Sequence, residues 1–238
     1  MHRIAIIALV ASMALAAAPA VAVGISWEVV DNYGQAIMLN RNSHCTAAAN
    51  VFTCHGLQRE HEPDDRLVTY AFMYVKQCIC GDRKNLPIHW FIGEGLTNLF
   101  QTRAEVTPAV RVRATRSKKS WERTGWEHYV QAISENRPVA ISYCYSAASA
   151  AGVEAAKGRY EECFSVVGIG WMNYDGQRLL ICHDGLRNDY RAGPAAGARL
   201  EASDLGINTA GKPWGRPGTT LYKWNGGQKN LLLVFTDA

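Results

Sequence analysis

Cysteines and histidines are the residues of this sequence that are best suited to chemistry. A thiol can join a disulfide, ligate a metal ion or, once ionised, act as a nucleophile, and an imidazole can ligate a metal or carry protons. The number of cysteines is odd, so at most three disulfides can form within the chain and at least one thiol must remain. The seven cysteines are Cys45, Cys54, Cys78, Cys80, Cys144, Cys163 and Cys182.

The first 22 residues are typical of a secretory signal peptide. The chain opens with a short basic segment, Met1-His2-Arg3, continues without a charge and reaches the small-residue site Ala20-Val21-Ala22. The apolar stretch is too short to span a bilayer, and Pro19 interrupts it. We therefore expect cleavage after Ala22, one mature domain over residues 23–238, no membrane span and a secreted or periplasmic location. Because such compartments are oxidising, we also expect disulfides, whose pairing the sequence leaves open.

A zinc site is the main alternative use of these side chains. Cys54, His55, Cys78 and Cys80 could supply four ligands. However, the sequence has no Cys-x-x-Cys pair of the kind that usually marks such sites. We therefore expect no metal and no cofactor, and we interpret Cys78 and Cys80 as halves of disulfides.

The elements that must position these residues fall into a helix-rich first part and a sheet-forming second part. The alanines of Cys45–Cys54 favour a helix, and the apolar residues of Trp126–Ile133 recur at helical spacing. The apolar segment Leu67–Val75 could be a helix or a strand, because its periodicity does not decide between them.

Strands dominate the second part of the sequence. Strands are predicted over residues 139–143, 164–171, 177–182, 219–224 and 230–236. Asp175-Gly176 and Asn225-Gly226 are typical two-residue hairpin turns, so each is expected to join the strands that flank it. The fold class is therefore predicted to be α+β, with helices first and an antiparallel β-sheet second.

Basic residues are concentrated between Arg103 and Arg123, where seven Lys or Arg face two acids. Val110-Arg111-Val112-Arg113 alternates like a strand with one solvated face, and a charged edge strand is the preferred interpretation. The formal net charge of the chain is only +4, whereas nucleic-acid binders carry a concentrated basic footprint. We therefore expect no nucleic-acid partner.

Three strings in the second part of the chain carry a family resemblance. They are Glu135-Asn-Arg-Pro-Val-Ala-Ile-Ser142, Phe164-Ser-Val-Val-Gly-Ile-Gly170 and Leu180-Ile-Cys-His-Asp-Gly185. They are similar to the secreted papain-like cysteine peptidases related to double-glycine leader (bacteriocin-processing) peptidases. In that family a Gly-Arg-Pro-Val strand is followed by a His-Ser-Val-Val-Gly strand and by a strand that ends in Asp or Asn. Upstream, Cys45-Thr-Ala-Ala-Ala-Asn50 resembles the nucleophile helix, Cys-x-Pro-Thr-Ala-Ala-Asn, but is one residue shorter and lacks the proline.

The resemblance implies a papain-like fold and, in an active member, a cysteine-type hydrolase of peptide or amide bonds. Cys45 falls at the nucleophile position, at the start of a helix whose dipole favours a thiolate. Asp184 falls at the position that orients the catalytic histidine. Phe164 occupies the position of that histidine, and a phenyl ring cannot accept a proton. His183 would be the substitute base, but neighbouring strand residues face opposite sides, so only one of His183 and Asp184 can point inward.

Three functional hypotheses remain open. In the first, the chain is a degenerate or inactive homologue that binds a peptide or protein, and this is the one we prefer. In the second, it is a hydrolase that uses Cys45, His183 and Asp184. In the third, it is a disulfide-stapled secreted effector or binding protein without hydrolase chemistry, which uses its basic segment to hold an anionic partner. Separately, the alternative interpretation of Cys45 itself is a disulfide to Cys54 or to another cysteine. We expect a monomer in each case.

Overall fold

The structure is a computed structural model that describes residues 24–38, 43–58, 63–80, 88–114, 119–144, 163–184, 198–224 and 231–237. The expected signal peptide, residues 1–22, lies outside these ranges, as does the expected Asn225-Gly226 turn. Within the described ranges, no helix is both long enough and apolar enough to cross a membrane.

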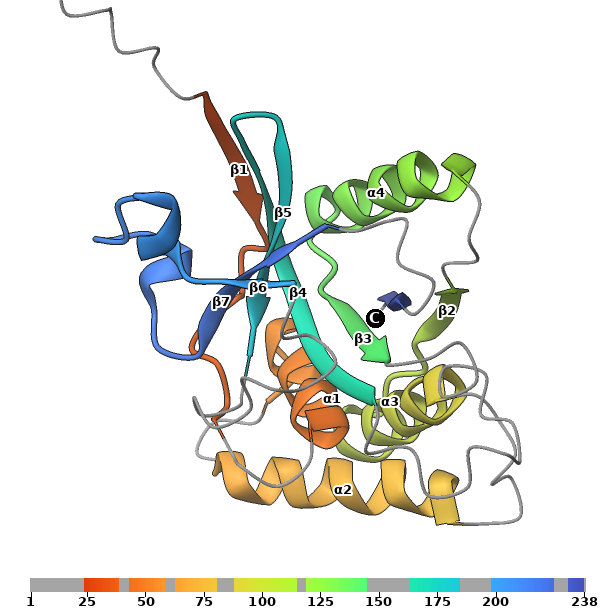
Figure 1. The fold of residues 1–238 in the computed structure, drawn as a ribbon. Coiled ribbons are helices and arrows are strands. Elements are labelled where there is room, and N and C mark those ends of the chain that lie inside the picture. Colours follow the sequence, from red (N-terminus) through yellow and green to blue (C-terminus); the bar gives the residue numbers. More distant parts are fainter. Residues whose placement is uncertain are drawn as a thin grey trace, which may run out of the picture.

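The helices form two groups on opposite sides of a sheet. The first three pack against one another, with α1 directly on strands β3 and β4, and α4 lies on the other side of those strands (Figure 1). The segment that could have been helix or strand is part of α2. The helices are α1 (Ser43–Cys54), α2 (Asp64–Cys80), α3 (Ile88–Ala104) and α4 (Lys119–Ser134).

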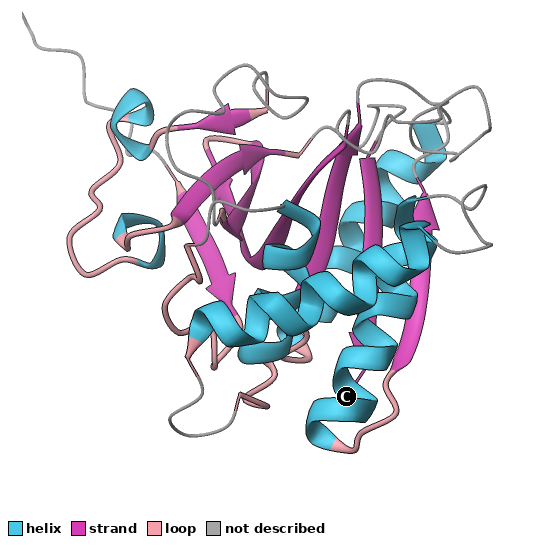
Figure 2. Cartoon of the chain, turned by 90° about the horizontal axis from the view of Figure 1, so that it is seen from below, coloured by secondary structure: helices cyan, strands magenta, loops and turns pink. Residues whose placement is uncertain are grey.

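The strands form one sheet in the order β2-β8-β3-β4-β5-β7-β6. Strand β1 is not part of this order and pairs with β4. All of the described pairings are antiparallel. Seen from below, the helices of the α1 side cross in front of the strands (Figure 2). The strands are β1 (Ile25–Val29), β2 (Ala109–Ala114), β3 (Val139–Cys144), β4 (Cys163–Tyr174), β5 (Gln177–His183), β6 (Arg199–Leu200), β7 (Thr219–Lys223) and β8 (Leu231–Asp237).

This architecture confirms the predicted α+β class with a mainly antiparallel sheet after the helices. Two strands depart from the predicted order, because β1 precedes every helix and β2 lies between α3 and α4. The basic segment around Arg111 forms β2, which pairs with β8 at the end of the strand order and is thus an edge strand, as predicted.

Helix α1 is the most deeply buried helix of the described chain. Ala47, Ala48 and Ala49 are at most 2% exposed, and Val51 and Phe52 are fully buried. Such small side chains let a helix approach the strands closely, so the alanine-rich composition reflects burial as well as helix propensity. The ring of Phe52 packs edge-on against Phe100 of α3 with ring centroids 5.2 Å apart.

The two predicted hairpins have different outcomes. Asp175 and Gly176 have φ values of 48° and 76° and join β4 to β5, so this hairpin is confirmed. The strands that flank Asn225-Gly226 do form, but they do not pair with each other, and this prediction was wrong. Strand β7 pairs with β5 and β6, whereas β8 lies between β2 and β3. Leu233 and Val234 are fully buried, which suits an interior strand covered on both faces.

Candidate functional site

A buried polar cluster surrounds the N-terminal end of α1. The Nδ1 atom of His44 and the Oγ atom of Ser165 on β4 share a hydrogen bond of 2.6 Å. The Ser165 hydroxyl also lies 2.7 Å from the hydroxyl of Ser142 on β3, and the Ser165 backbone N–H donates to Ser43 Oγ at 3.2 Å. His44, Ser142 and Ser165 are each at most 4% exposed. This cluster therefore ties the start of α1 to the adjoining ends of β3 and β4.

Cys45 follows His44 at this end of the helix and is 1% exposed. Burial raises the pKa of its thiol from 9.0 to about 12. A helix N-terminus stabilises a nearby negative charge by about 0.3–1 kcal/mol, whereas one pKa unit corresponds to about 1.4 kcal/mol. The helix dipole is therefore too weak to offset desolvation, and Cys45 is a neutral thiol near pH 7.

Phe164 occupies the position at which the resemblance expects the catalytic histidine. It is partly buried, packs against the hydrophobic core and lies opposite Tyr143 in the pairing of β3 with β4. Because strand residues alternate between faces and Ser165 contacts the start of α1, Phe164 is placed on the other face of β4. The imidazole that meets β4 beside Cys45 comes instead from His44.

The opposite end of α1 brings a cysteine and a histidine together. The Sγ atom of Cys54 lies 3.8 Å from Nδ1 of His183, at the end of β5, and 3.8 Å from the backbone oxygen of Tyr33. Both partners are buried, and the Nε2 atom of His183 has no hydrogen-bond partner within the described part of the chain. This contact is long for a hydrogen bond, so the two side chains are weakly coupled.

Burial sets the ionisation of this pair. It raises the pKa of the Cys54 thiol to about 12, an effect that a hydrogen bond from Thr53 only partly opposes. Burial and then the nearby charge of Arg216 lower the pKa of His183 to about 4. A cysteine peptidase works through a thiolate beside an imidazolium, which these shifts disfavour. Cys54 and His183 are therefore a neutral thiol and a neutral imidazole.

Asp184 has a separate set of partners. Its Oδ2 atom accepts a 2.8 Å hydrogen bond from the Tyr222 hydroxyl and lies 3.6 Å from Nε of Arg199. Its backbone N–H donates to the Gly218 oxygen at 2.7 Å. Asp184 is thus held by β6, β7 and the turn before β7, whereas His183 contacts α1. Both residues are buried, and their side chains contact different elements.

The three residues predicted to form a catalytic site therefore lie in three separate places. His183 lies beside Cys54, which follows Cys45 by nine residues on α1. At a rise of 1.5 Å per residue this separates the two cysteines by about 13 Å. The catalytic roles of Cys45, His183 and Asp184 stay a prediction, and the geometry requires a rearrangement before they can act together.

The structure describes the side chains of Cys45, Cys54 and Cys182, whereas those of Cys78 and Cys80, the expected disulfide halves and zinc ligands, lie outside the described residues. Cys45, Cys54 and Cys182 are not in a disulfide, which excludes the alternative bridge between Cys45 and Cys54. Across the described residues, no group of three or more His, Cys, Asp or Glu side chains could hold a metal ion. His55, one member of the zinc set, contacts the hydroxyl of Thr236 through Nε2 at 3.0 Å.

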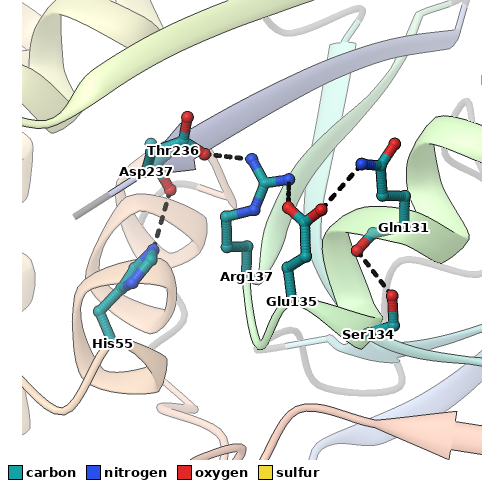
Figure 3. Close-up of polar contacts among 7 residues, drawn as sticks. All are labelled: His55, Gln131, Ser134, Glu135, Arg137, Thr236 and Asp237. Carbon is teal, nitrogen blue, oxygen red and sulfur yellow. Dashed lines mark hydrogen bonds and ion pairs between the residues drawn. The ribbon is translucent and has the colours of Figure 1, made fainter.

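A cluster of charged side chains lies near the C-terminal end of α1 (Figure 3). Arg137 forms ion pairs with Glu135 and Asp237, and these residues line a shallow depression of about 450 Å³ together with Gln131. The guanidinium already has a carboxylate on each side, so the cluster is better suited to joining β8 to the turn after α4 than to binding an anion. It has no catalytic arrangement of side chains.

His44, Ser142 and Ser165 were not singled out by the sequence as functional, and neither was the partnership of Cys54 with His183. The sequence does place His44 directly before the expected nucleophile and Ser165 directly after Phe164, and these positions were the available indication of the cluster. Their meeting depends on contacts between residues more than 100 positions apart in the chain. Comparison with known proteins finds no family model that matches this chain and no matching curated protein.

Proposed function

We propose that this chain is a secreted papain-like protein that has lost cysteine-peptidase activity and serves as a binding module for a peptide or protein. The state of Cys45 is the observation that carries the proposal. This thiol is 1% exposed, and burial raises its pKa to about 12. A peptidase nucleophile has to reach its substrate and ionise near neutral pH. Cys45 meets neither condition in this structure.

The position of α1 supports the papain-like part of the proposal. The start of this helix, with Cys45, lies beside Ser165 near the beginning of β4, the strand that carries Phe164. The resemblance implies this neighbourhood, since the family pairs its nucleophile helix with the strand that begins at the catalytic histidine. The architecture is also compatible with other α+β folds, so the papain-like assignment is our proposal.

Asn136 gives a second, local support. Its φ of 61° lies in the left-handed region, which Gly and Asn adopt at the least cost. This residue stands where the family's Gly-Arg-Pro-Val strand has its glycine. Its side chain also accepts a 2.6 Å hydrogen bond from the backbone N–H of Asp31, at the end of the β1 region. Asn136 therefore adopts a backbone conformation that a glycine at this position would adopt without strain.

The hydrolase alternative is less well supported. It needs an imidazole beside Cys45 that can take up the thiol proton. His183 contacts Cys54 at the far end of α1. His44 is beside Cys45 in sequence, but its Nδ1 atom is engaged with Ser165 in the buried cluster. The binding function consequently requires fewer changes to the folded state than hydrolysis does.

The test combines peptide hydrolysis with thiol reactivity. The mature chain is incubated with a library of fluorogenic peptide substrates, and is separately alkylated with iodoacetamide at about pH 7.5 in native buffer and in concentrated urea. We expect no hydrolysis. We also expect Cys45 to react about a thousandfold more slowly in the native chain, because raising the pKa from 9.0 to about 12 reduces the thiolate fraction by that factor.

Matched variants make the result specific. The tryptic peptide 42–59 contains both Cys45 and Cys54. Labelling is therefore followed in Cys45→Ser and in Cys54→Ser, each of which leaves one thiol in that peptide. Hydrolysis that disappears in Cys45→Ser but persists in Cys54→Ser would overturn the proposal, as would alkylation of Cys45 that is faster in native buffer than in urea.

A further inference from the structure

Cys144 and Cys163 occupy the last register position of the β3–β4 pair. Their Cα atoms are partners across the two antiparallel strands, where β3 ends and β4 begins. Directly opposite residues of such strands have Cα atoms about 4.5 or 5.5 Å apart, depending on the type of pair. A disulfide requires a Cα separation of about 4.4–6.8 Å. The backbone therefore holds these two positions at bridging distance.

The register pair two positions along the ladder shows how close opposite residues come here. Ser142 and Ser165 are also register partners, two residues along each strand from the cysteines. Their hydroxyl oxygens lie 2.7 Å apart. Because the type of pair repeats every two residues along an antiparallel ladder, the two cysteine positions have the same backbone pair type as the serine positions.

The positions of the other cysteines make this pair distinctive. Cys45, Cys54 and Cys182 are buried and are not in a disulfide. Cys78 and Cys80 lie two positions apart on α2, and residues at that spacing do not face each other on a helix. Among the described strand pairings, Cys144 with Cys163 is the one register position at which two cysteines are opposite.

We propose that Cys144 and Cys163 form a cross-strand disulfide in the mature protein. The bond forms by exchange with an external disulfide, such as oxidised glutathione or a dithiol oxidase of the export compartment. The thiolate of one cysteine attacks the external disulfide and releases one thiol, and the second cysteine then attacks the mixed disulfide and releases the other. The two cysteines lose two protons and two electrons, and the external disulfide gains both.

The bridge closes the chain between the two strands beside the start of α1. It encloses residues 145–162 in a covalent loop and fixes β3 to β4 next to the Ser142–Ser165 pair. Because Ser165 in turn contacts Ser43 and His44, the disulfide anchors the strands on which the N-terminal end of α1 rests. This role does not depend on whether the protein hydrolyses or binds peptides.

Peptide mapping tests the bond directly. The full mature chain is equilibrated in a glutathione redox buffer, alkylated without reductant and digested with trypsin. Cleavage after Lys157 and Arg159 places the two cysteines on separate peptides, residues 124–157 and 160–178, each of which contains one cysteine. We expect these peptides to be recovered as a linked pair that separates on reduction. Recovery of both as alkylated single peptides, or of either linked to another cysteine, would overturn the proposal.

Thermal unfolding tests the contribution of the bond to stability. Reduction is expected to lower the Tm of the wild type by about 5 °C or more, since a disulfide of this loop size constrains the unfolded chain. The double variant Cys144→Ser/Cys163→Ser should have the Tm of the reduced wild type, whether or not reductant is present. Cys80→Ser serves as the matched control and should keep the response to reductant. An unchanged wild-type Tm on reduction, or a double variant that still responds, would count against the bridge.

Discussion

The two ends of α1 each bring a histidine close to a cysteine, but they differ in how well the histidine is bonded. At the N-terminal end, His44 is held by a 2.6 Å hydrogen bond to Ser165, which in turn meets Ser142. At the C-terminal end, His183 faces the Cys54 sulfur at 3.8 Å, and its Nε2 atom has no partner among the described residues. The first end is a satisfied polar cluster, whereas the second holds a buried imidazole with one unpartnered nitrogen.

This difference shows that proximity of a thiol and an imidazole does not by itself make a catalytic pair. Both cysteines have a pKa of about 12, because burial outweighs every local stabilisation of the thiolate. Catalysis would require one end to open to solvent or to gain a stabilising charge. The two ends should therefore respond differently to pH and to substitution, since only one of them depends on hydrogen bonds to its histidine.

The largest expected effect is an acid sensitivity that arises at the C-terminal end. His183 has a folded-state pKa of about 4, against 6.5 for the unfolded chain. Because the unfolded state binds the proton more readily, stability is complete above about pH 6.5 and is lost as the pH falls towards 4. For this one group the loss at pH 4 is about 3 kcal/mol. We therefore expect the free energy of unfolding, measured by urea titration, to fall between pH 7 and pH 4 by about 3 kcal/mol less in His183→Leu than in the wild type.

Other groups also titrate in this range, so the difference between the two proteins is the quantity to measure. His55, whose pKa burial lowers to about 4, is present in both and contributes equally. If the wild type and His183→Leu lose the same stability between pH 7 and pH 4, then His183 is hydrated or charged in the folded state, and its description as a buried neutral imidazole is wrong.

The local parts of this molecule were predictable from its sequence. The helices around Cys45 and Trp126 follow from composition and spacing, and the Asp175-Gly176 turn follows from the positive φ that both residues tolerate. In each case the determining interactions lie within a few residues of one another, so the sequence pattern contains the information.

The remaining parts depend on which distant segments meet. Asn225-Gly226 has good turn chemistry, yet β8 pairs with β2 and β3, because its buried apolar residues gain more from an interior position than from a hairpin. The partner of Cys54 was missed for a similar reason. Helix α1 is buried on all sides, so helical periodicity did not indicate which of its residues would meet β5.

The same substitution at both histidines should distinguish the two ends. His44→Leu removes a buried hydrogen bond and leaves Ser165 without its imidazole partner, which is expected to lower the free energy of unfolding by about 2 kcal/mol. At neutral pH, His183→Leu replaces a poorly bonded ring with an apolar side chain and should change it by less than about 1 kcal/mol. Urea unfolding at pH 7 measures both. Equal costs would show that His183 has a partner as effective as Ser165.

The smallest effect concerns two hydroxyl groups, one near each end of α1. Ser43 accepts the backbone N–H of Ser165 across the interface, so Ser43→Ala leaves a donor of β4 without this acceptor and should cost about 1 kcal/mol. Thr53 donates to the Asn50 carbonyl within its own helix, and alanine has the higher helix propensity, so Thr53→Ala should stay within about 0.5 kcal/mol. Urea unfolding of the two single variants at pH 7 gives both values. A larger loss for Thr53→Ala would mean that the C-terminal end relies on hydrogen bonding as much as the N-terminal end does, because the Thr53 hydroxyl would then be supporting Cys54 and through it His183.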